Sequence, residues 1–266
     1  MSLLVQHALW IGGPPGVGKS TVADRLARRH GLRLYSADTR TWSHRDRALA
    51  DGVEAAVRWE ELPPDERGTG SPDELLAMSL HIERGPMVVD DVRALPDAPL
   101  VLAEGTTMPA TLVPADRALW LMPTPDVQRR RLEERGLPPA AQALYELLAA
   151  RIEAEAAEAR VPVLPVDGSL GIEETVDRVE HHFAWFLAAA PRASTTAERQ
   201  ALLREANLDV VAQLRGYFAR PWAAGSVEEA ERSFACECGD PACIARVETT
   251  VGTAAVERVL EPGHER

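Results

Sequence analysis

The sequence predicts an α/β fold built on a parallel β-sheet, followed by a small C-terminal unit. Over the first 190 of its 266 residues, short apolar runs alternate with stretches of helical periodicity, which is the pattern of parallel strands joined by helices. A glycine-rich stretch separates the first apolar run from the first helical one. All three cysteines lie between positions 236 and 243, so a second, differently built region is expected there.

Five apolar runs are expected to form the strands of one sheet, at residues 7–11, 32–35, 99–103, 117–121 and 161–166. A helix is expected from Lys19 to about His30, and another from Glu173 to about Ala189 closes the first domain, which we place at residues 1–190. Residues 40–95 are expected to be mostly helical, with a break at LPPDERGTGSP.

The run PMVVDDV allows a second interpretation within this helical segment. Asp90 and Asp91 follow apolar residues, as acidic residues do at the end of a Walker-B strand. However, apolar residues here also recur at helical spacing, and only the seven residues 92–98 separate the run from the next strand. That is too short for a crossover between parallel strands, so we interpret 86–95 as helix.

Composition and charge exclude several classes of protein. The formal net charge is −12 and the pI is about 5.1, whereas a protein that binds duplex nucleic acid usually presents a basic stripe to the phosphates. The first residues, MSLLVQHALW, lack the features of a signal peptide, and no apolar run approaches the roughly 18 residues that span a bilayer. We expect a cytoplasmic protein with no nucleic-acid or membrane partner.

The stretch GPPGVGKS fits the phosphate-binding motif G-x-x-x-x-G-K-[ST] without a mismatch. It follows an apolar strand and opens a helix, which is the context that the motif requires. Backbone N–H groups of such a loop, together with the positive end of the helix dipole, bind phosphates. Lys19 is expected to reach the β- and γ-phosphates of ATP, and Ser20 to hold Mg²⁺. The expected nucleotide-binding residues of the loop are Gly13, Pro14, Pro15, Gly16, Val17, Gly18, Lys19, Ser20 and Thr21.

Lys19 is the only lysine of the chain, in which arginine supplies all the other strongly basic side chains. An ammonium group is compact and fits between two phosphates inside the loop, whereas the planar guanidinium is wider and forked. We therefore expect that arginine cannot replace lysine at this position.

With this motif in place, the first 190 or so residues resemble the P-loop kinases of small molecules and nucleotides, such as adenylate, shikimate and gluconate kinase and the chloramphenicol phosphotransferases. The resemblance implies a three-layer α/β/α fold around a five-stranded parallel sheet. It also implies an enzyme that transfers the γ-phosphoryl group of Mg·ATP to a hydroxyl group of a small molecule.

Two acidic residues match positions that the resembled kinases use. YSADTR places Asp38 after the second strand, where it could orient or deprotonate the acceptor hydroxyl; capping of the next helix is its alternative role. Thr39 and Arg40 could add substrate contacts. PLVLAEG places Glu104 after the third strand, where a carboxylate would bind a Mg²⁺ water or a substrate group. Asp91 stays open as the alternative to Glu104.

A cluster of arginines follows the fourth strand, in LMPTPDVQRRRLEERG. In the resembled kinases the lid begins here, and its arginines stabilise the negative charge of the transferring phosphoryl group. Arg131 and Arg135 lie four residues apart on one helix face, so we expect them to act together as catalytic residues; ion pairs with neighbouring glutamates are the alternative. Arg151 is a weaker candidate for the lid, and Asp167 and Gly168 are weaker candidates for adenine contacts.

Two other classes of nucleotide-binding protein do not fit the sequence. HRD at 44–46 lacks the asparagine that the catalytic loop of protein kinases needs five residues after its aspartate, where Asp51 stands. The N-K-x-D guanine motif of GTPases is also absent from the sequence.

A linker, PRASTT at 191–196, is expected to precede a C-terminal unit at 195–266. Thr195 and Glu198 have the spacing of a capping box, which predicts that a helix begins there. The apolar stripe of this helix is expected to pack within the chain; a homodimer seam is the weaker alternative, because Gln213 interrupts the stripe. The stripe consists of Leu203, Val210, Leu214 and Tyr217.

The cysteines lie in FACECGDPACIARVE, as Cys236, Cys238 and Cys243, and His264 follows in the tail PGHER. Zn²⁺ in structural sites takes four cysteine or histidine ligands, so we expect a structural zinc site of these four residues. Free thiols, a redox pair and iron–sulfur ligation are the alternatives. The stretch also resembles a small module common at the ends of bacterial proteins, with its middle shortened here.

Two further functions stay open on the sequence alone. One is a P-loop ATPase switch that acts on a protein partner through the C-terminal unit, and the other is a nucleotide-binding protein without turnover. The acceptor of a kinase is equally open among sugar acids, nucleosides, antibiotics and phosphorylated small acids. Trp42, Trp59 and Arg67 could line its pocket, although burial in the interior is the more usual role of tryptophan.

Overall fold

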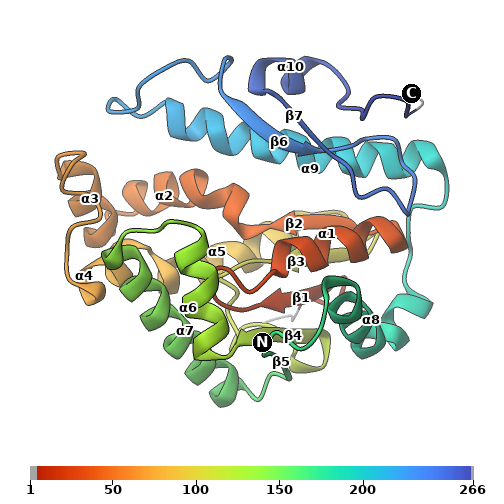
Figure 1. The fold of residues 1–266 in the computed structure, drawn as a ribbon, viewed down its shortest axis with the longest axis horizontal. Helices are drawn as coiled ribbons and strands as arrows, with labels where there is room; N and C mark the ends of the chain where they lie inside the picture. Colours follow the sequence, from red (N-terminus) through yellow and green to blue (C-terminus); the bar gives the residue numbers. More distant parts are fainter. Residues whose placement is uncertain (1–4, 265–266) are drawn as a thin grey trace.

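The computed structural model describes residues 5–264 and confirms the α/β fold (Figure 1). Five parallel strands form one sheet in the order β2-β3-β1-β4-β5. Each strand begins and ends within two residues of its expected position. The strands are β1 (Ala8–Gly12), β2 (Arg33–Ser36), β3 (Val101–Glu104), β4 (Ala118–Pro123) and β5 (Val163–Val166).

Helices connect these strands and fill the segment between β2 and β3. The segment expected to be helical contains four helices after a short 3₁₀ turn, and the run PMVVDDV lies inside the last of them, as predicted. These elements are η1 (Ala37–Arg40), α2 (Thr41–Ala50), α3 (Glu54–Glu61), α4 (Pro72–Met78) and α5 (His81–Ala94). The remaining helices of this part are α1 (Lys19–His30), η2 (Ala115–Arg117), α6 (Pro125–Glu134), α7 (Pro139–Ala159) and α8 (Ile172–Ala189).

The sheet lies between two layers of helices, which gives the expected three-layer arrangement. Alternate residues of a strand point to opposite faces, so Trp10 packs into one apolar cluster and the neighbouring Leu9 into the other. Side chains of α5 and α7 cover the Trp10 face, and those of α1 and α8 cover the Leu9 face. The carboxyl ends of the strands therefore open at one edge between the layers, where ligands of such sheets bind.

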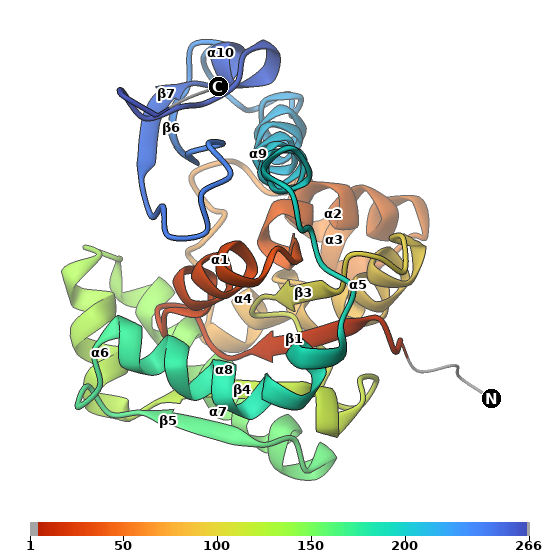
Figure 2. The same cartoon turned by 90° about the vertical axis from the view of Figure 1, so that its right-hand side faces the viewer.

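A smaller unit follows α8 and forms the upper lobe in Figure 2. It contains α9 (Thr196–Phe218), the antiparallel pair β6 (Glu231–Ala235) and β7 (Arg246–Thr250), and α10 (Val251–Val256). The predicted capping box is present, because Thr195 accepts from the N–H of Glu198 and Glu198 accepts from that of Thr195. The unit has its own apolar cluster of Val211, Phe234, Val251, Ala254 and Val259.

The long helix α9 packs against the main domain as well as against its own unit. It lies beside β2, the edge strand, where Arg33 pairs with Glu205 at 3.0 Å. Of the predicted stripe, Val210 and Leu214 pack on the small apolar cluster, while Tyr217 stacks on Trp42 of α2.

The exact division of the chain near residue 190 stays a prediction. Within residues 5–264 there is no helix long and apolar enough to cross a bilayer.

Candidate active site

The phosphate loop occupies the turn between β1 and α1, as its motif predicts. Gly13 has a φ of 140°, and a Cβ at this position would lie 2.2 Å from the backbone oxygen of Leu121. Only glycine can combine that backbone conformation with so close an approach. The loop then turns into the first residues of α1, so Lys19 and Ser20 stand at the positive end of the helix.

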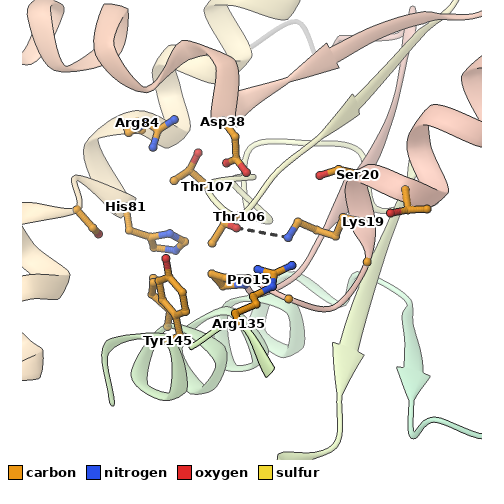
Figure 3. A pocket seen from close by; sticks show the side chains of 15 residues that line it. Pro15, Lys19, Ser20, Asp38, His81, Arg84, Thr106, Thr107, Arg135 and Tyr145 are labelled. Atoms are coloured by element: carbon orange, nitrogen blue, oxygen red, sulfur yellow. Dashed lines mark hydrogen bonds between the residues drawn. The ribbon is translucent and has the colours of Figure 1, made fainter. Parts of the chain in front are cut away.

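Lys19 is buried, with 5% of its surface exposed. Its Nζ donates to the backbone oxygen of Pro14 at 3.0 Å and lies 3.4 Å from Oγ1 of Thr106 (Figure 3). Burial lowers the pKa of Lys19, and the carboxylates of Asp38 and Glu104 act in the opposite direction. The ammonium group is therefore held against its own loop, near the acidic residues Glu104 at the end of β3 and Asp38 on the turn after β2.

The carboxylate of Glu104 lies beside the hydroxyl of Ser20. The Ser20 hydroxyl donates to Oε2 of Glu104 at 3.1 Å, and the Ser36 hydroxyl donates to Oε1 at 2.5 Å. Burial and the nearby Asp38 raise the pKa of Glu104 to about 7, against the effect of Lys19. A hydroxyl next to a carboxylate is a donor set that suits the hard Mg²⁺ ion.

Asp91, the alternative to Glu104 as the magnesium-binding carboxylate, lies away from Ser20. It lies on α5, where its carboxylate accepts hydrogen bonds from the Tyr35 hydroxyl at 2.9 Å and from Nε2 of His44 at 2.8 Å. Arg47 adds an ion pair at 2.9 Å. Asp91 thus belongs to a polar network behind the site and does not contact Ser20.

One cavity of about 400 Å³ joins the phosphate loop to Asp38. Figure 3 shows Lys19 and Ser20 on one side of it and Arg84 and His81 on another. Asp38 lies on the 3₁₀ turn η1, at the carboxyl end of β2. The cavity is lined by Pro15, Gly16, Gly18, Lys19, Ser20, Thr21, Asp38, Ser79, His81, Arg84, Thr106, Thr107, Arg135, Tyr145 and Leu148.

The wall away from the phosphate loop carries polar atoms that lack partners. Arg84 is 6% exposed and makes no ion pair within residues 5–264; its NH2 donates to the backbone oxygen of Ala37 at 2.6 Å. Nδ1 of His81 and Oγ1 of Thr107 are buried without a hydrogen-bond partner in the described chain. His81 donates through Nε2 to Glu155 at 3.2 Å, so in the neutral ring Nδ1 is an acceptor.

The arginines of the predicted lid are separated by the structure. Arg135 lines the cavity. Arg131 instead donates to the backbone oxygens of Gly16 and Val17, at 3.2 and 3.0 Å, so it contacts the outside of the phosphate loop. The other candidates lie outside the cavity lining: Arg129, Arg130, Arg151, Asp167 and Gly168. Arg129 and Arg130 are exposed beside Asp126 and Glu134. Arg151 pairs with Glu155, and Asp167 accepts a hydrogen bond from Ser169.

The tryptophans of the helical insert face α9 and lie outside the cavity lining. Trp42 and Trp59 stack with Trp222 and Tyr217, with ring centroids between 5.3 and 5.8 Å apart. Arg67 stacks on Trp59, 4.5 Å from its ring centroid. These side chains therefore join the insert to the C-terminal unit.

The three cysteines and His264 come together in the C-terminal unit, on the side that contacts α1. Their ligand atoms all lie within 4.8 Å of one another, and Nδ1 of His264 is 3.3 Å from Sγ of Cys236 and 3.7 Å from Sγ of Cys243. Three sulfurs and one imidazole form a donor set that fits structural Zn²⁺. Arg28 of α1 donates to the backbone oxygen of Cys236 at 2.9 Å, which fastens this cluster to the helix of the phosphate loop.

Sequence reasoning missed most of the cavity wall that lies away from the phosphate loop. His81 and Arg84 lie three residues apart on a helix whose other buried residues are apolar, and this was the available signal. Thr106, Thr107 and Tyr145 belong to no motif. They reach the site only because the chain after β3 and helix α7 fold over it.

The fold and the phosphate loop define a P-loop domain. A family model described as an AAA domain matches residues 10–159, more than half of the chain, and the chain belongs to that family. Among solved structures, the shikimate kinase of Bacteroides thetaiotaomicron is 18% identical with a TM-score of 0.39, over 66% of this chain and 98% of that one. No curated protein matches the sequence.

Proposed function

We propose that this protein is an ATP-dependent phosphotransferase that moves the γ-phosphoryl group of Mg·ATP to a hydroxyl group of a small molecule. The observation that carries the proposal is the single cavity shared by the phosphate loop and Asp38. A nucleotide switch needs only the loop, whereas a kinase also needs an enclosed place for an acceptor beside a base. The predicted cytoplasmic location and the homodimer stay predictions.

The residues can be assigned to the steps of the reaction. The acceptor oxygen attacks the γ-phosphorus while its proton passes to the carboxylate of Asp38, and the bond to the bridging β-oxygen breaks to release ADP. Lys19 and Arg135 stabilise the charge on the transferring group, and Arg131 supports the loop from outside. Ser20 and Glu104 would hold Mg²⁺, which neutralises phosphate charge.

The cavity wall favours an acceptor that carries an anionic group as well as its hydroxyl. Arg84 is a buried cation that makes no ion pair in the described chain; burial lowers its pKa, against the effect of the carboxylates of Asp38 and Asp91. A buried charge is unfavourable unless it is paired. A carboxylate or phosphate on the acceptor would pair with Arg84 and accept from the Thr107 hydroxyl. Nδ1 of His81 would accept from a second hydroxyl of the same molecule.

We also propose that Cys236, Cys238, Cys243 and His264 bind Zn²⁺ with a structural role. Four protein ligands leave no coordination position for water or substrate. The small apolar cluster of this unit has five buried members among the described residues, and a unit with so small a core usually needs a metal or a disulfide.

A ligand screen tests the proposed function. Thermal shift and ADP release would be measured with Mg·ATP and a panel of hydroxy acids, sugar phosphates, nucleosides and neutral polyols, with Lys19→Ala as the control. We expect an anionic compound to raise both the melting temperature and ADP release only when Lys19 is intact. Steady ATP hydrolysis that no compound stimulates would contradict the kinase, and stimulation by a protein partner would favour the switch.

A further inference from the structure

The turn that carries Asp38 is short and is held mainly through its neighbours. Within residues 5–264 no group donates a hydrogen bond to the Asp38 carboxylate, so its position depends on the backbone of η1. Internal bonds hold the two ends of this turn, from the Thr39 hydroxyl to the oxygen of Ser36 and from the Thr41 hydroxyl to the oxygen of Asp38. Four residues of 3₁₀ structure have little stability by themselves.

The inner side of the turn is fixed by residues of the active site. Arg84 donates to the backbone oxygen of Ala37 at 2.6 Å, and Ser36 donates to Glu104. These contacts lie on the side of the turn that faces the cavity and the β3 strand. They do not restrain its other side, which faces the C-terminal unit.

The outer side of the turn is held by α9. Arg40, two residues after Asp38, donates through NH2 to Oδ2 of Asp209 at 2.8 Å. Both side chains are largely buried, with 29% and 20% of their surface exposed. A pair shielded to this degree orients its partners more strongly than an exposed pair, which often contributes little.

Two further contacts place α9 against the start of α2. The N–H of Trp42 donates to Oε1 of Gln213 at 3.3 Å, and this explains the polar residue that interrupts the apolar stripe of α9. A Cβ at Gly216 would lie 2.8 Å from Cβ of Trp42, so glycine allows the two helices to approach closely. Around this point the stacked aromatic rings of Trp42, Tyr217 and Trp222 extend the contact.

We infer that Asp209 is a positioning residue for phosphoryl transfer, which acts through Arg40 to hold Asp38 at the acceptor. Helix α9 is therefore a part of the catalytic machinery although it contributes no side chain to the cavity. The inference rests on the proposed function for its catalytic consequence, and on the geometry of η1 for the positioning itself.

Hydrogen exchange of the full-length protein tests the positioning without any acceptor. Asp209→Asn is expected to speed amide exchange in residues 37–41 and to leave the phosphate loop, residues 13–20, unchanged. Asp209→Glu, which keeps the carboxylate, is expected to restore much of the protection. The matched control is Arg215→Ala. Arg215 lies on α9, like Asp209, and its loss breaks an exposed ion pair with Glu228. This control is expected to change exchange in neither segment. Unchanged exchange at 37–41 in Asp209→Asn would overturn the inference.

The kinetic test uses the slow hydrolysis of Mg·ATP, with water as the acceptor. Asp209→Asn is expected to lower the hydrolysis rate by about 10- to 100-fold, the usual effect of a small misplacement of a catalytic group, with Mg·ATP affinity unchanged. In an Asp38→Asn background the same substitution is expected to have no further effect. An equal effect in both backgrounds would overturn the inference. Hydrolysis that does not depend on Asp38 at all would instead refute the proposed function, and exchange at 37–41 would still measure the positioning.

Discussion

The two ends of the cavity face each other but are built in different ways. The nucleotide end consists of one contiguous stretch, residues 13–20, whose phosphate-binding groups are mostly backbone N–H donors at a helix start. The acceptor end consists of side chains from separate parts of the chain. These are Asp38 of η1, Ser79, His81 and Arg84 around the start of α5, Thr107 after β3 and Tyr145 of α7.

Because of this difference, the residues of the two ends differ in how freely they can be substituted. A site built from backbone needs particular residues at fixed spacing, so its chemistry and its sequence are tied together. A site built from dispersed side chains can change any one of them while the fold stays the same. In the proposed reaction, the nucleotide end would therefore define the type of chemistry, and the acceptor end would define which molecule receives the phosphoryl group.

Lys19 gives the largest effect expected at the nucleotide end. Lys19→Ala is expected to lower the rate of phosphoryl transfer by about 10²- to 10³-fold, as loss of a preorganised charge donor does in other enzymes. Lys19→Arg is expected to recover little, because a guanidinium does not fit between the phosphates inside the loop. Both are measured as initial rates at saturating Mg·ATP. Wild-type activity in Lys19→Arg would show that this end is less constrained than its motif implies.

Arg84 provides the corresponding test at the acceptor end. Arg84→Gln removes the unpaired buried cation, and the KM for an anionic acceptor is expected to rise by about 10- to 100-fold, the effect of losing a charged hydrogen bond. The KM for Mg·ATP is expected to stay unchanged. Arg47→Gln, on the exposed side of α2, serves as the matched control and is expected to have little effect. A rise in the KM for Mg·ATP would remove the distinction between the two ends.

Removal of metal from the proposed zinc site tests whether a change outside the cavity affects the nucleotide end. Cys238→Ser, or treatment with a chelator, is expected to lower the melting temperature by about 10 °C, because binding to an ordered site contributes directly to stability. The affinity for ADP, measured by calorimetry, is expected to change by less than about twofold, since the phosphate loop is distant. Zinc content is measured by mass spectrometry. A protein purified without metal and with an unchanged melting temperature would contradict the zinc site.

Acid gives the smallest expected effect and acts on His44, which lies outside the cavity lining and contacts Arg84 of the acceptor end. Burial lowers the pKa of His44 below its ordinary value of 6.5, and its neutral Nδ1 accepts from Arg84 at 3.4 Å. Below pH 6.5 the unfolded chain binds a proton that folded His44 does not, so the free energy of unfolding falls by up to about 1.4 kcal/mol per pH unit. Denaturant unfolding between pH 7.5 and 5.5 measures this slope. It is expected to be smaller in His44→Gln, and an equal slope in both proteins would contradict the assignment.

The sequence was sufficient for the parts of the molecule that local rules specify. Strand positions followed from apolar runs, and α5 was distinguished from a strand by its crossover length. Glu104 was carried over from the resembled kinases as the acidic residue after the third strand, and it lies beside Ser20 because β1 and β3 are neighbours in the sheet. Such predictions need only the periodicity of an element and the edge of the sheet at which it ends.

The rest of the site depends on tertiary contacts that spacing does not encode. Arg131 and Arg135 have the spacing of one helix face, yet Arg131 contacts the loop backbone, whereas Arg135, the residue just after α6, lines the cavity. Arg40, considered as a substrate contact, turns toward Asp209, which lies 169 residues away in the sequence. Only the packing of α9 against the main domain brings that partner within reach.

The position of α9 beside β2 has a consequence for any shortened form of this protein. β2 pairs with β3 on one side only, and α9 lies against the strand and binds Arg33 at its start. A chain that ended after α8 would expose the free edge of β2, and such an edge is a template for strand pairing between molecules. The P-loop domain produced alone would therefore tend to aggregate, and loss of activity in that form would reflect insolubility as much as chemistry.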